Sequence, residues 1–374
     1  MSLLKQDFEW LHAHPELSYE EYETTNYVRN RLTEAGVEIL PYLLETGLVA
    51  QVQGKAEGPV VALRADMDAL LVQEESGVAY ASCNAGKMHA CGHDFHTAVL
   101  LDTARKLQAK KDALAGTVRL IFQPGEERSD GALKILATPA MQDVQAVFAL
   151  HTAPWFPVGT IGVRNGAASA SVDRFEITVT GQGCHAASPE KGVDAIVAAA
   201  AIVSAAQTVV SRNVSPVHPA LVSITHFEAG TTWNVIPESA YLEGTVRTHF
   251  AADREMIPQR LEAIAKGVAA GYGTTATFTW HAGPPATDND PEWTAFAAEV
   301  AQKQGITVEE DPANMLGEDF SWFQQKAPGV YIHVGVGLTK PLHNPGFTVD
   351  EASLEPAAAY SAALAQAALE KLAK

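Results

Sequence analysis

The sequence has 374 residues, 47% of them hydrophobic and 19% charged, and its formal net charge is −18. This length exceeds what one hydrophobic core comfortably serves, so we expect a globular protein with two domains. The negative charge repels phosphate backbones and acidic lipid headgroups, which argues against nucleic acid and membrane surfaces as partners.

Cysteine usage and hydropathy are typical of a cytoplasmic protein. Three cysteines, an odd number in a long chain, do not suggest a disulfide framework, so a cysteine in a polar cluster is better interpreted as a metal-binding or catalytic thiol. No run approaches the roughly 18 uninterrupted apolar residues of a membrane helix. The N-terminus carries charges where a signal peptide has its apolar core. We therefore expect a cytoplasmic location and no membrane segment.

The first part of the chain alternates helical patterns with short apolar runs. Ser18 precedes Glu21 by three residues, a capping-box pattern that predicts the start of a helix ending at Gly36. Further on, the pattern predicts buried strands at 59–66, 116–123 and 146–151 and helices at about 97–110 and 131–137. Continuous apolar strands between helices predict a mostly parallel, mixed sheet with helices on both faces. Sites in such sheets gather just past the carboxyl ends of the strands.

A different pattern begins after Ser169. Apolar and polar residues alternate from 173 to 180, and two strand–helix–strand units extend to about residue 284. These units predict a two-layer α+β domain, an antiparallel four-stranded sheet carrying two helices. Beyond the turn-rich GPPATDNDP the α/β pattern resumes. The expected organisation is a discontinuous α/β domain, 1–170 and 285–374, with an inserted domain at 171–284.

The stretch KMHACGHDFH packs a cysteine, an aspartate and three histidines into ten residues. Cys91 and His93 stand two apart in a loop, before a helix that Asp94 would cap. A base two residues from a nucleophilic cysteine on a loop tends to point away from it, whereas two metal ligands can converge on ions above the loop. The stretch therefore favours metal binding over a reactive thiol. We interpret the neighbouring His89 and His96 as structural or supporting residues.

Two adjacent carboxylates, Glu126 and Glu127, follow the predicted strand in LIFQPGEE. The two negative carboxylates repel each other unless a cation lies between them. In a metal site one glutamate can bind an ion while the other acts as a general base toward water. A solvated surface pair is the alternative that this stretch leaves open.

His151 ends another predicted buried strand, and His343 lies in a Pro/Gly-rich loop near the C-terminus. Each histidine alone is more often structural or exposed than a ligand. Together with the cysteine and glutamate motifs, however, they supply sulfur, nitrogen and oxygen donors at the strand exits of one sheet. That combination suits zinc-like ions, with manganese or nickel as alternatives.

Motifs spread over nearly the whole chain resemble the metal-dependent amidohydrolase family of hippurate hydrolase, N-acyl-L-amino-acid amidohydrolase and auxin-conjugate (IAA-amino acid) hydrolase, which is related to aminoacylase and glutamate carboxypeptidase. The motifs occur in the same order, and they are LHAHPELSYEEYETT, VALRADMDAL, KMHACGHDFHTA, FQPGEE, GQGCHAASPEKGVDAI, AGTTWNVIPESAYLEGTVRT, GEDFSWF and LHNPGFTVDEASL. The resemblance implies a zinc-exopeptidase-like catalytic domain and a two-metal centre with Glu126 as the base. The ligands that it implies are Cys91, His93, Glu127, His151 and His343.

The same resemblance assigns supporting roles outside the ligand set. His185 matches a lid histidine that approaches the oxyanion, in some relatives from a partner subunit, and it is the second expected catalytic residue. Asn234 and Arg247 are candidates to bind the substrate carboxylate, since the planar guanidinium matches two oxygens. Many distant relatives carry His-x-Asp on the strand of Asp66, so we expect Asp66, like Asp94, to support the ligands without binding metal.

These expectations describe a two-metal hydrolase that cleaves the amide bond of N-acyl amino acids, acetyl, benzoyl or similar, with Glu126 activating a water that bridges the metals. Manganese or zinc is favoured, with nickel or cobalt as alternatives. The inserted domain would serve as a lid and as the contact of a homodimer or homotetramer. Three alternatives stay open: a dipeptidase or carboxypeptidase with the same centre, a thiol hydrolase using Cys91, and a metal-binding protein without activity.

Overall fold

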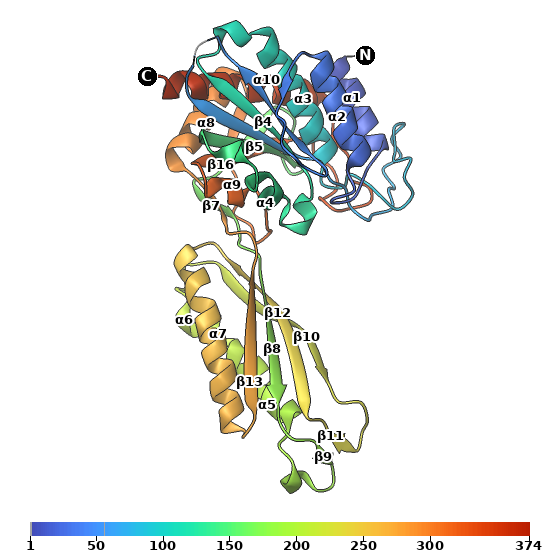
Figure 1. Cartoon of the computed structure of the whole chain (residues 1–374), viewed down its shortest axis with the longest axis vertical. Helices are drawn as coiled ribbons and strands as arrows, with labels where there is room; N and C mark the ends of the chain where they lie inside the picture. Colours follow the sequence, from blue (N-terminus) through green and yellow to red (C-terminus); the bar gives the residue numbers. More distant parts are fainter. Residues whose placement is uncertain (1, 56) are drawn as a thin grey trace. The chain divides into compact units, whose positions relative to one another are not determined.

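The computed structural model describes residues 2–55 and 57–374, and the chain forms two compact units (Figure 1). The first unit comprises Met1–Ala168, Thr287–Ala313 and Asp319–Lys374, and the second comprises Ser169–Ala286 and Asn314–Glu318. The second unit thus begins and ends two residues outside the insertion expected at 171–284. It also takes up a short segment that the sequence pattern did not indicate.

An eight-stranded sheet forms the centre of the first unit. Its order is β1 (Glu38–Ile39), β2 (Leu48–Gln53), β4 (Thr117–Gln123), β3 (Val60–Asp66), β5 (Val144–Ala153), β16 (Gly329–Gly335), β6 (Thr160–Val163) and β15 (Thr307–Glu310). The four central strands β4, β3, β5 and β16 run parallel, whereas β2 and β6 pair with this group antiparallel. The mostly parallel, mixed sheet expected from the sequence is confirmed.

Helices cover both faces of this sheet. Successive residues of its strands point to opposite faces, so each strand contributes to the cores on both sides. Leu63 of β3 belongs to the core beneath the larger helices, and the preceding Ala62 belongs to the core beneath the shorter ones. The larger helices are α1 (Leu3–Ala13), α2 (Tyr22–Glu34), α3 (His93–Ala109), α8 (Pro291–Lys303) and α10 (Leu354–Leu372) (Figure 1). The shorter helices are α4 (Gly131–Leu136) and α9 (Ser321–Gln324). A two-stranded ribbon consists of β7 (Gly166–Ser169) and β14 (Thr287–Asn289).

The second unit contains a four-stranded antiparallel sheet packed against helices on one face. The strand order is β10 (Ala220–Ala229), β12 (Ser239–Thr248), β8 (Asp173–Thr180) and β13 (Thr275–Ala282). Phe175, Ile177 and Val179 of β8 are fully buried in the core, as their period-two spacing predicted. The helices are α5 (Ala195–Ala206), α6 (Thr208–Asn213) and α7 (Ala251–Gly271), and a small ribbon pairs β9 (Cys184–His185) with β11 (Val235–Ile236). The first of the two expected helices is thus divided in two.

The helical stretch Ala195–Asn213 is long and apolar enough to cross a membrane by length and composition. Core helices of other proteins meet the same criterion, and Ala198, Ala199 and Ile202 of this stretch are completely buried against the sheet. The expectation that the chain holds no membrane segment overlooked this stretch, because it considered only uninterrupted apolar runs.

The predicted capping box at the start of α2 is wrong. The helix begins at Tyr22 without a side-chain cap from its N-cap residue Glu21, and the Glu16 carboxylate accepts the backbone N–H groups of Glu23 and Thr24. Instead, the Ser18 hydroxyl donates a 2.7 Å hydrogen bond to Asp68 Oδ2, on a segment far away in sequence. The Glu16 carboxylate is a stronger acceptor for the Glu23 and Thr24 N–H groups than a serine hydroxyl is, so it replaces the expected cap.

Candidate active site

The cysteine–histidine motif lies at a tight junction between a loop and helix α3. The helix begins at His93, and Gly92 takes the position before it with a left-handed φ of 83°. A Cβ atom on Gly92 would come within 2.5 Å of the Thr152 side chain, whose hydroxyl donates to the Cys91 carbonyl oxygen. The expected cap at Asp94 is therefore wrong, because Gly92 occupies the cap position. The Asp94 carboxylate lies inside the first turn, and its Oδ2 is 2.6 Å from His12 Nδ1.

Residues from three distant segments meet at one group of donor atoms. One ligand atom each of Cys91, Glu127 and His343 lies within 4.8 Å of the other two. His343 Nε2 is 3.4 Å from Glu127 Oε1, and the His343 backbone N–H donates to the Ala90 carbonyl oxygen. The adjacent thiol and carboxylate raise the pKa of His343 to about 10. The thiol of Cys91 and the carboxylate of Glu127 therefore favour a positive charge beside them.

His151 joins this group from the end of strand β5. Its Nδ1–H donates to the Thr152 carbonyl oxygen at 2.9 Å, which leaves Nε2 to face Cys91 Sγ at 3.5 Å. Burial and the nearby His96 lower the pKa of His151 well below its ordinary value. A neutral ring, oriented by a backbone carbonyl and presenting a lone pair, is the form in which histidine binds metals.

A second donor group shares Glu127 with the first. It contains His93, Glu126 and Glu127, again with ligand atoms within 4.8 Å of one another. His93 Nε2 and Glu127 Oε1 are buried and make no hydrogen bond among the described residues, although Asp66 Oδ2 and His343 Nε2 lie 3.6 and 3.4 Å from them. Buried polar atoms are normally satisfied, so these two atoms and the adjacent thiol fit coordination of divalent cations.

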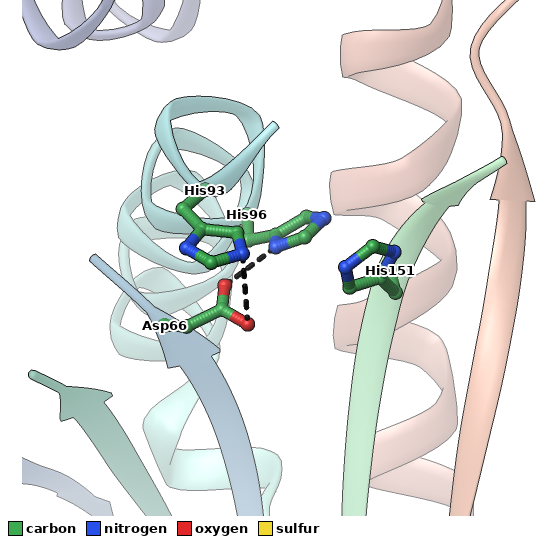
Figure 2. A group of neighbouring side chains, drawn as sticks. All are labelled: Asp66, His93, His96 and His151. Carbon is green, nitrogen blue, oxygen red and sulfur yellow. Dashed lines mark hydrogen bonds and ion pairs between the residues drawn. The ribbon is translucent and has the colours of Figure 1, made fainter. Parts of the chain in front are cut away.

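A third cluster contains Asp66, His93, His96 and His151 (Figure 2). His96 accepts the Thr152 backbone N–H at Nε2, 2.8 Å away, so its proton is on Nδ1, which donates to Asp66 Oδ1 at 2.6 Å. Both ring nitrogens of His96 are thus occupied by the protein, and this histidine is a support and not a ligand.

Asp66 is anchored from the opposite side by an arginine. The Arg64 guanidinium lies 2.6 Å from Asp66 Oδ2, and His93 Nε2 lies 3.6 Å from the same oxygen. Burial alone would raise the pKa of Asp66, but Arg64 and the two histidines outweigh burial and hold the pKa well below its usual range. Asp66 therefore presents a negative charge beside His93.

Asp68 is the supporting residue that the sequence analysis missed. Its carboxylate accepts hydrogen bonds from His93 Nδ1 at 3.3 Å and from the backbone N–H groups of Glu126 at 3.1 Å and Glu127 at 3.0 Å. It is buried, and the hydrogen bond from His93 helps to lower its pKa against the effect of burial. The spacing of RADMDA could have revealed it, since Asp66 and Asp68 fall two apart at the exit of one strand.

A second histidine–carboxylate pair lies beside His151 and was also missed. His333 of β16 is paired in register with His151, and the two ring centroids are 5.8 Å apart. His333 Nδ1–H donates to the buried Asp311 at 2.6 Å. The half-exposed Trp155 packs edge-on against His333, with the two ring centroids 5.0 Å apart. His333, with Asp311 and Trp155 against it, thus lies beside the expected ligand His151.

In the second unit the structure brings two of the three predicted residues together. His185 pairs with Val235 in the β9–β11 ribbon, and Ala186 N–H donates to the Asn234 carbonyl oxygen at 3.0 Å. The His185 ring is exposed and accepts the Ala187 backbone N–H at Nδ1, so Nε2 carries its proton. Both residues lie in the small ribbon beside the Ser239 end of β12.

Arg247 is held apart from them, near the other end of β12. Eight residues separate Ser239 from Arg247 along the strand, which is about 26 Å at the usual strand rise. The guanidinium donates to Thr245 and to the Val246 carbonyl oxygen at 3.0 Å, and burial lowers its pKa. Arg247 and the His185–Asn234 pair thus lie toward opposite ends of β12.

A mixed α/β sheet with thiol, imidazole and carboxylate donors gathered at its strand exits defines a candidate metal-dependent hydrolase. The chain belongs to peptidase family M20/M25/M40, whose model matches residues 62–367.

Individual relatives agree with this assignment. The chain is 46% identical over 363 residues to an N-acetylcysteine deacetylase of Bacillus subtilis, covering 97% of this chain and 96% of the relative. It is 38% identical to thermostable carboxypeptidase 2 of Saccharolobus solfataricus, covering 95% and 92%. A crystal structure of a Bacillus subtilis dinuclear metal-binding peptidase of the M20 family superposes with a TM-score of 0.90 at 43% identity, covering 98% of both chains. The family resemblance, the fold class and the expectation of an amidohydrolase enzyme are confirmed.

We predict that Asp68→Asn lowers turnover by roughly 10- to 100-fold and weakens metal binding, the usual effect of removing a group that orients a ligand. An asparagine has one acceptor oxygen for donors from His93, Glu126 and Glu127, and its NH₂ group would face one of them. Turnover and metal content after dialysis against graded chelator measure the effect. A variant with wild-type values for both would contradict the role described for Asp68.

Proposed function

We propose that this enzyme hydrolyses the amide bond of N-acyl amino acids, such as N-acetyl or N-benzoyl derivatives, to a carboxylate and a free amino acid. The observation that carries the proposal is the position of Glu126, whose carboxylate lies in one donor group with His93 and Glu127. A general base must lie within reach of the water that it deprotonates, and here a buried carboxylate borders the candidate ligands.

The proposed centre holds two divalent ions, as the printed description of the Bacillus subtilis structure states for that protein. The residues that would bind them are Cys91, His93, Glu127, His151 and His343. Manganese or zinc is favoured by the mixed donors, with nickel or cobalt as alternatives. When bound, such ions lower the pKa of water and polarise the scissile carbonyl.

Glu126 accepts the proton of the attacking water and delivers it to the departing nitrogen. An amine is a poor leaving group, so the proton must arrive as the C–N bond breaks, and such acid–base work contributes typically 10²- to 10⁴-fold. The neighbouring Glu127 shares a donor group with Cys91 and His343. The two adjacent glutamates therefore divide the work, Glu126 toward the proton and Glu127 toward the metal.

A dipeptidase or carboxypeptidase with the same centre is the second candidate. The observation that favours it is the 38% identity to a relative named carboxypeptidase. That match covers nearly as much of both chains as the match to the deacetylase does. Both activities cleave an amide next to a free carboxylate, so one centre could serve either. The deacylase proposal takes precedence because the relative named N-acetylcysteine deacetylase is more similar in sequence, at 46% identity.

The separation of about 26 Å within the second unit supports a shared active site. We propose that Arg247 binds the substrate carboxylate, and that His185 and Asn234 act in the active site of a partner subunit, where His185 donates to the oxyanion. The assembly would be a homodimer or homotetramer formed through the second unit. Its edge strand β10 supports this, since it pairs on one side only and carries the half-exposed Phe227.

The proposal also includes a cytoplasmic location. All three cysteines, Cys83, Cys91 and Cys184, are free thiols in the structure, which agrees with a reducing compartment.

We predict that the metal-replete enzyme hydrolyses N-acetyl and N-benzoyl amino acids faster than dipeptides, loses the activity on chelation and regains it with Mn²⁺ or Zn²⁺. Initial rates over a substrate panel, on protein of measured metal content, provide the test. A preference for dipeptides would favour the second candidate. Activity that survives chelation but not alkylation would point to Cys91 as a nucleophile and overturn the metal mechanism.

We predict that Glu126→Gln loses nearly all turnover, at least 10²-fold, yet keeps its bound metal. The amide retains the size of the side chain but cannot accept a proton at neutral pH. Metal analysis and steady-state rates of the variant and the wild type provide the measurement. Near wild-type turnover in metal-replete variant protein would remove Glu126 from the mechanism.

Mixing two inactive variants tests the shared site. His185→Ala and Glu126→Gln each disable every site of a homodimer, but a hybrid dimer regains one intact site from the Glu126 of one subunit and the His185 of the other. After subunit exchange we expect about a quarter of wild-type activity, since half of the dimers are hybrids with one working site. If hybrids form and no activity returns, His185 does not serve a partner.

A further inference from the structure

The loop that carries Glu126 is held by carboxylates at three consecutive backbone N–H groups. Glu126 and Glu127 donate to Asp68, and Gly125 donates to Glu21 Oε1 at 2.8 Å. These groups begin the short 3₁₀ turn Glu126–Arg128 and have no partner within that turn. Both accepting carboxylates are buried, Glu21 completely. The direction of this turn therefore depends on two side chains from elsewhere in the sequence.

Tyr19 holds the same loop from the N-terminal segment. A Cβ atom on Gly125, whose φ is 66°, would come within 2.5 Å of the Tyr19 ring. The Tyr19 hydroxyl donates to Asp130, at the far end of the loop. Tyr19 itself has a left-handed φ of 68°, a strained conformation for an aromatic residue. A backbone held against its preference indicates that the surrounding contacts define this segment tightly.

Ser18 completes the arrangement from the same segment. Its hydroxyl donates to Asp68 Oδ2. Ser18, which contacts the acceptor Asp68, is therefore adjacent in sequence to Tyr19, which contacts the loop itself. The backbone also docks here, because the Ala69 N–H donates to the Glu16 carbonyl oxygen. Residues 16–21 and the loop 124–131 thus form one connected body around Asp68.

We propose that Glu21 is a positioning residue for catalysis, which fixes the Gly125 peptide and thereby aims the Glu126 carboxylate. The inference rests on the proposed role of Glu126 as the base. Glycine in the left-handed region can rotate more freely than any other residue, so the Gly125 peptide needs an external partner to keep one orientation. Without an acceptor the buried N–H would turn to find another, and Glu126 would turn with it.

The expected effect of this movement is kinetic. A displacement of about 1 Å of a catalytic group can cost 10²-fold in rate while the rest of the site stays intact. Four of the five proposed metal ligands lie outside this turn, and the fifth, Glu127, keeps its own backbone hydrogen bond to Asp68. A positioning role therefore predicts a lower kcat with an unchanged KM, unchanged metal content and unchanged fold.

The test compares four proteins: wild type, Glu21→Met, Glu21→Gln and Glu20→Gln. Methionine fills the space but offers no good acceptor, so we expect kcat to fall roughly 30- to 100-fold, with KM and bound metal within twofold of wild type. Glutamine keeps an amide oxygen for the Gly125 N–H and should restore kcat to within about fivefold, the range of one neutral hydrogen bond. Glu20→Gln is the matched control, since Glu20 is exposed and its carboxylate pairs with Lys87 instead.

Each outcome separates this inference from the proposed function. Wild-type protein that hydrolyses no N-acyl amino acid or dipeptide would refute the proposed function itself. Active wild type combined with unchanged kcat in Glu21→Met would overturn the role of Glu21 alone. Circular dichroism and thermal melting of each variant complete the test, because loss of the fold in Glu21→Met, or a parallel loss of metal, would assign Glu21 a structural role and overturn the inference.

Discussion

The carboxylate of Asp68 is the point on which the candidate site depends. It accepts the N–H groups of the turn that carries Glu126 and Glu127 and the Nδ1–H of His93. One anion therefore orients a candidate base and two candidate ligands at once. Because each bond constrains a different segment, loss of this single charge would loosen strand β3, helix α3 and the 126–128 turn together.

The site also concentrates negative charge in a buried space. Asp66 and Asp68 lie behind the donor atoms, and Glu126 is buried in front of them. Arg64 neutralises part of this charge by its contact with Asp66, and the histidines neutralise another part. Buried carboxylates that repel one another are stable only when cations lie among them. The electrostatics of the fold thus agree with the proposed two-ion centre.

Much of this arrangement could be predicted because parallel strands end at one edge. Glu127 follows a predicted buried strand, His151 ends another, and Cys91 lies in a loop between a strand and a helix, so the sequence alone suggested that their side chains gather at one edge of the sheet. Local rules failed where another carboxylate or a glycine took over: Glu16, and not Ser18, accepts the first N–H groups of α2, and Gly92, not Asp94, is the residue before α3. The distance between His185 and Arg247 was likewise hidden, because it depends on how far strand β12 runs between them.

Cys91 shows how the environment decides between two chemistries for one residue. Burial raises the pKa of its thiol, and the negative charge of Glu127 raises it further. A nucleophilic cysteine needs the opposite, a lowered pKa in an accessible, electropositive place. A divalent ion reverses the balance, since coordination deprotonates a thiol outright. The surroundings of Cys91 therefore disfavour a free thiolate and suit a thiolate bound to metal, and in this scheme the catalytic proton transfer belongs to Glu126.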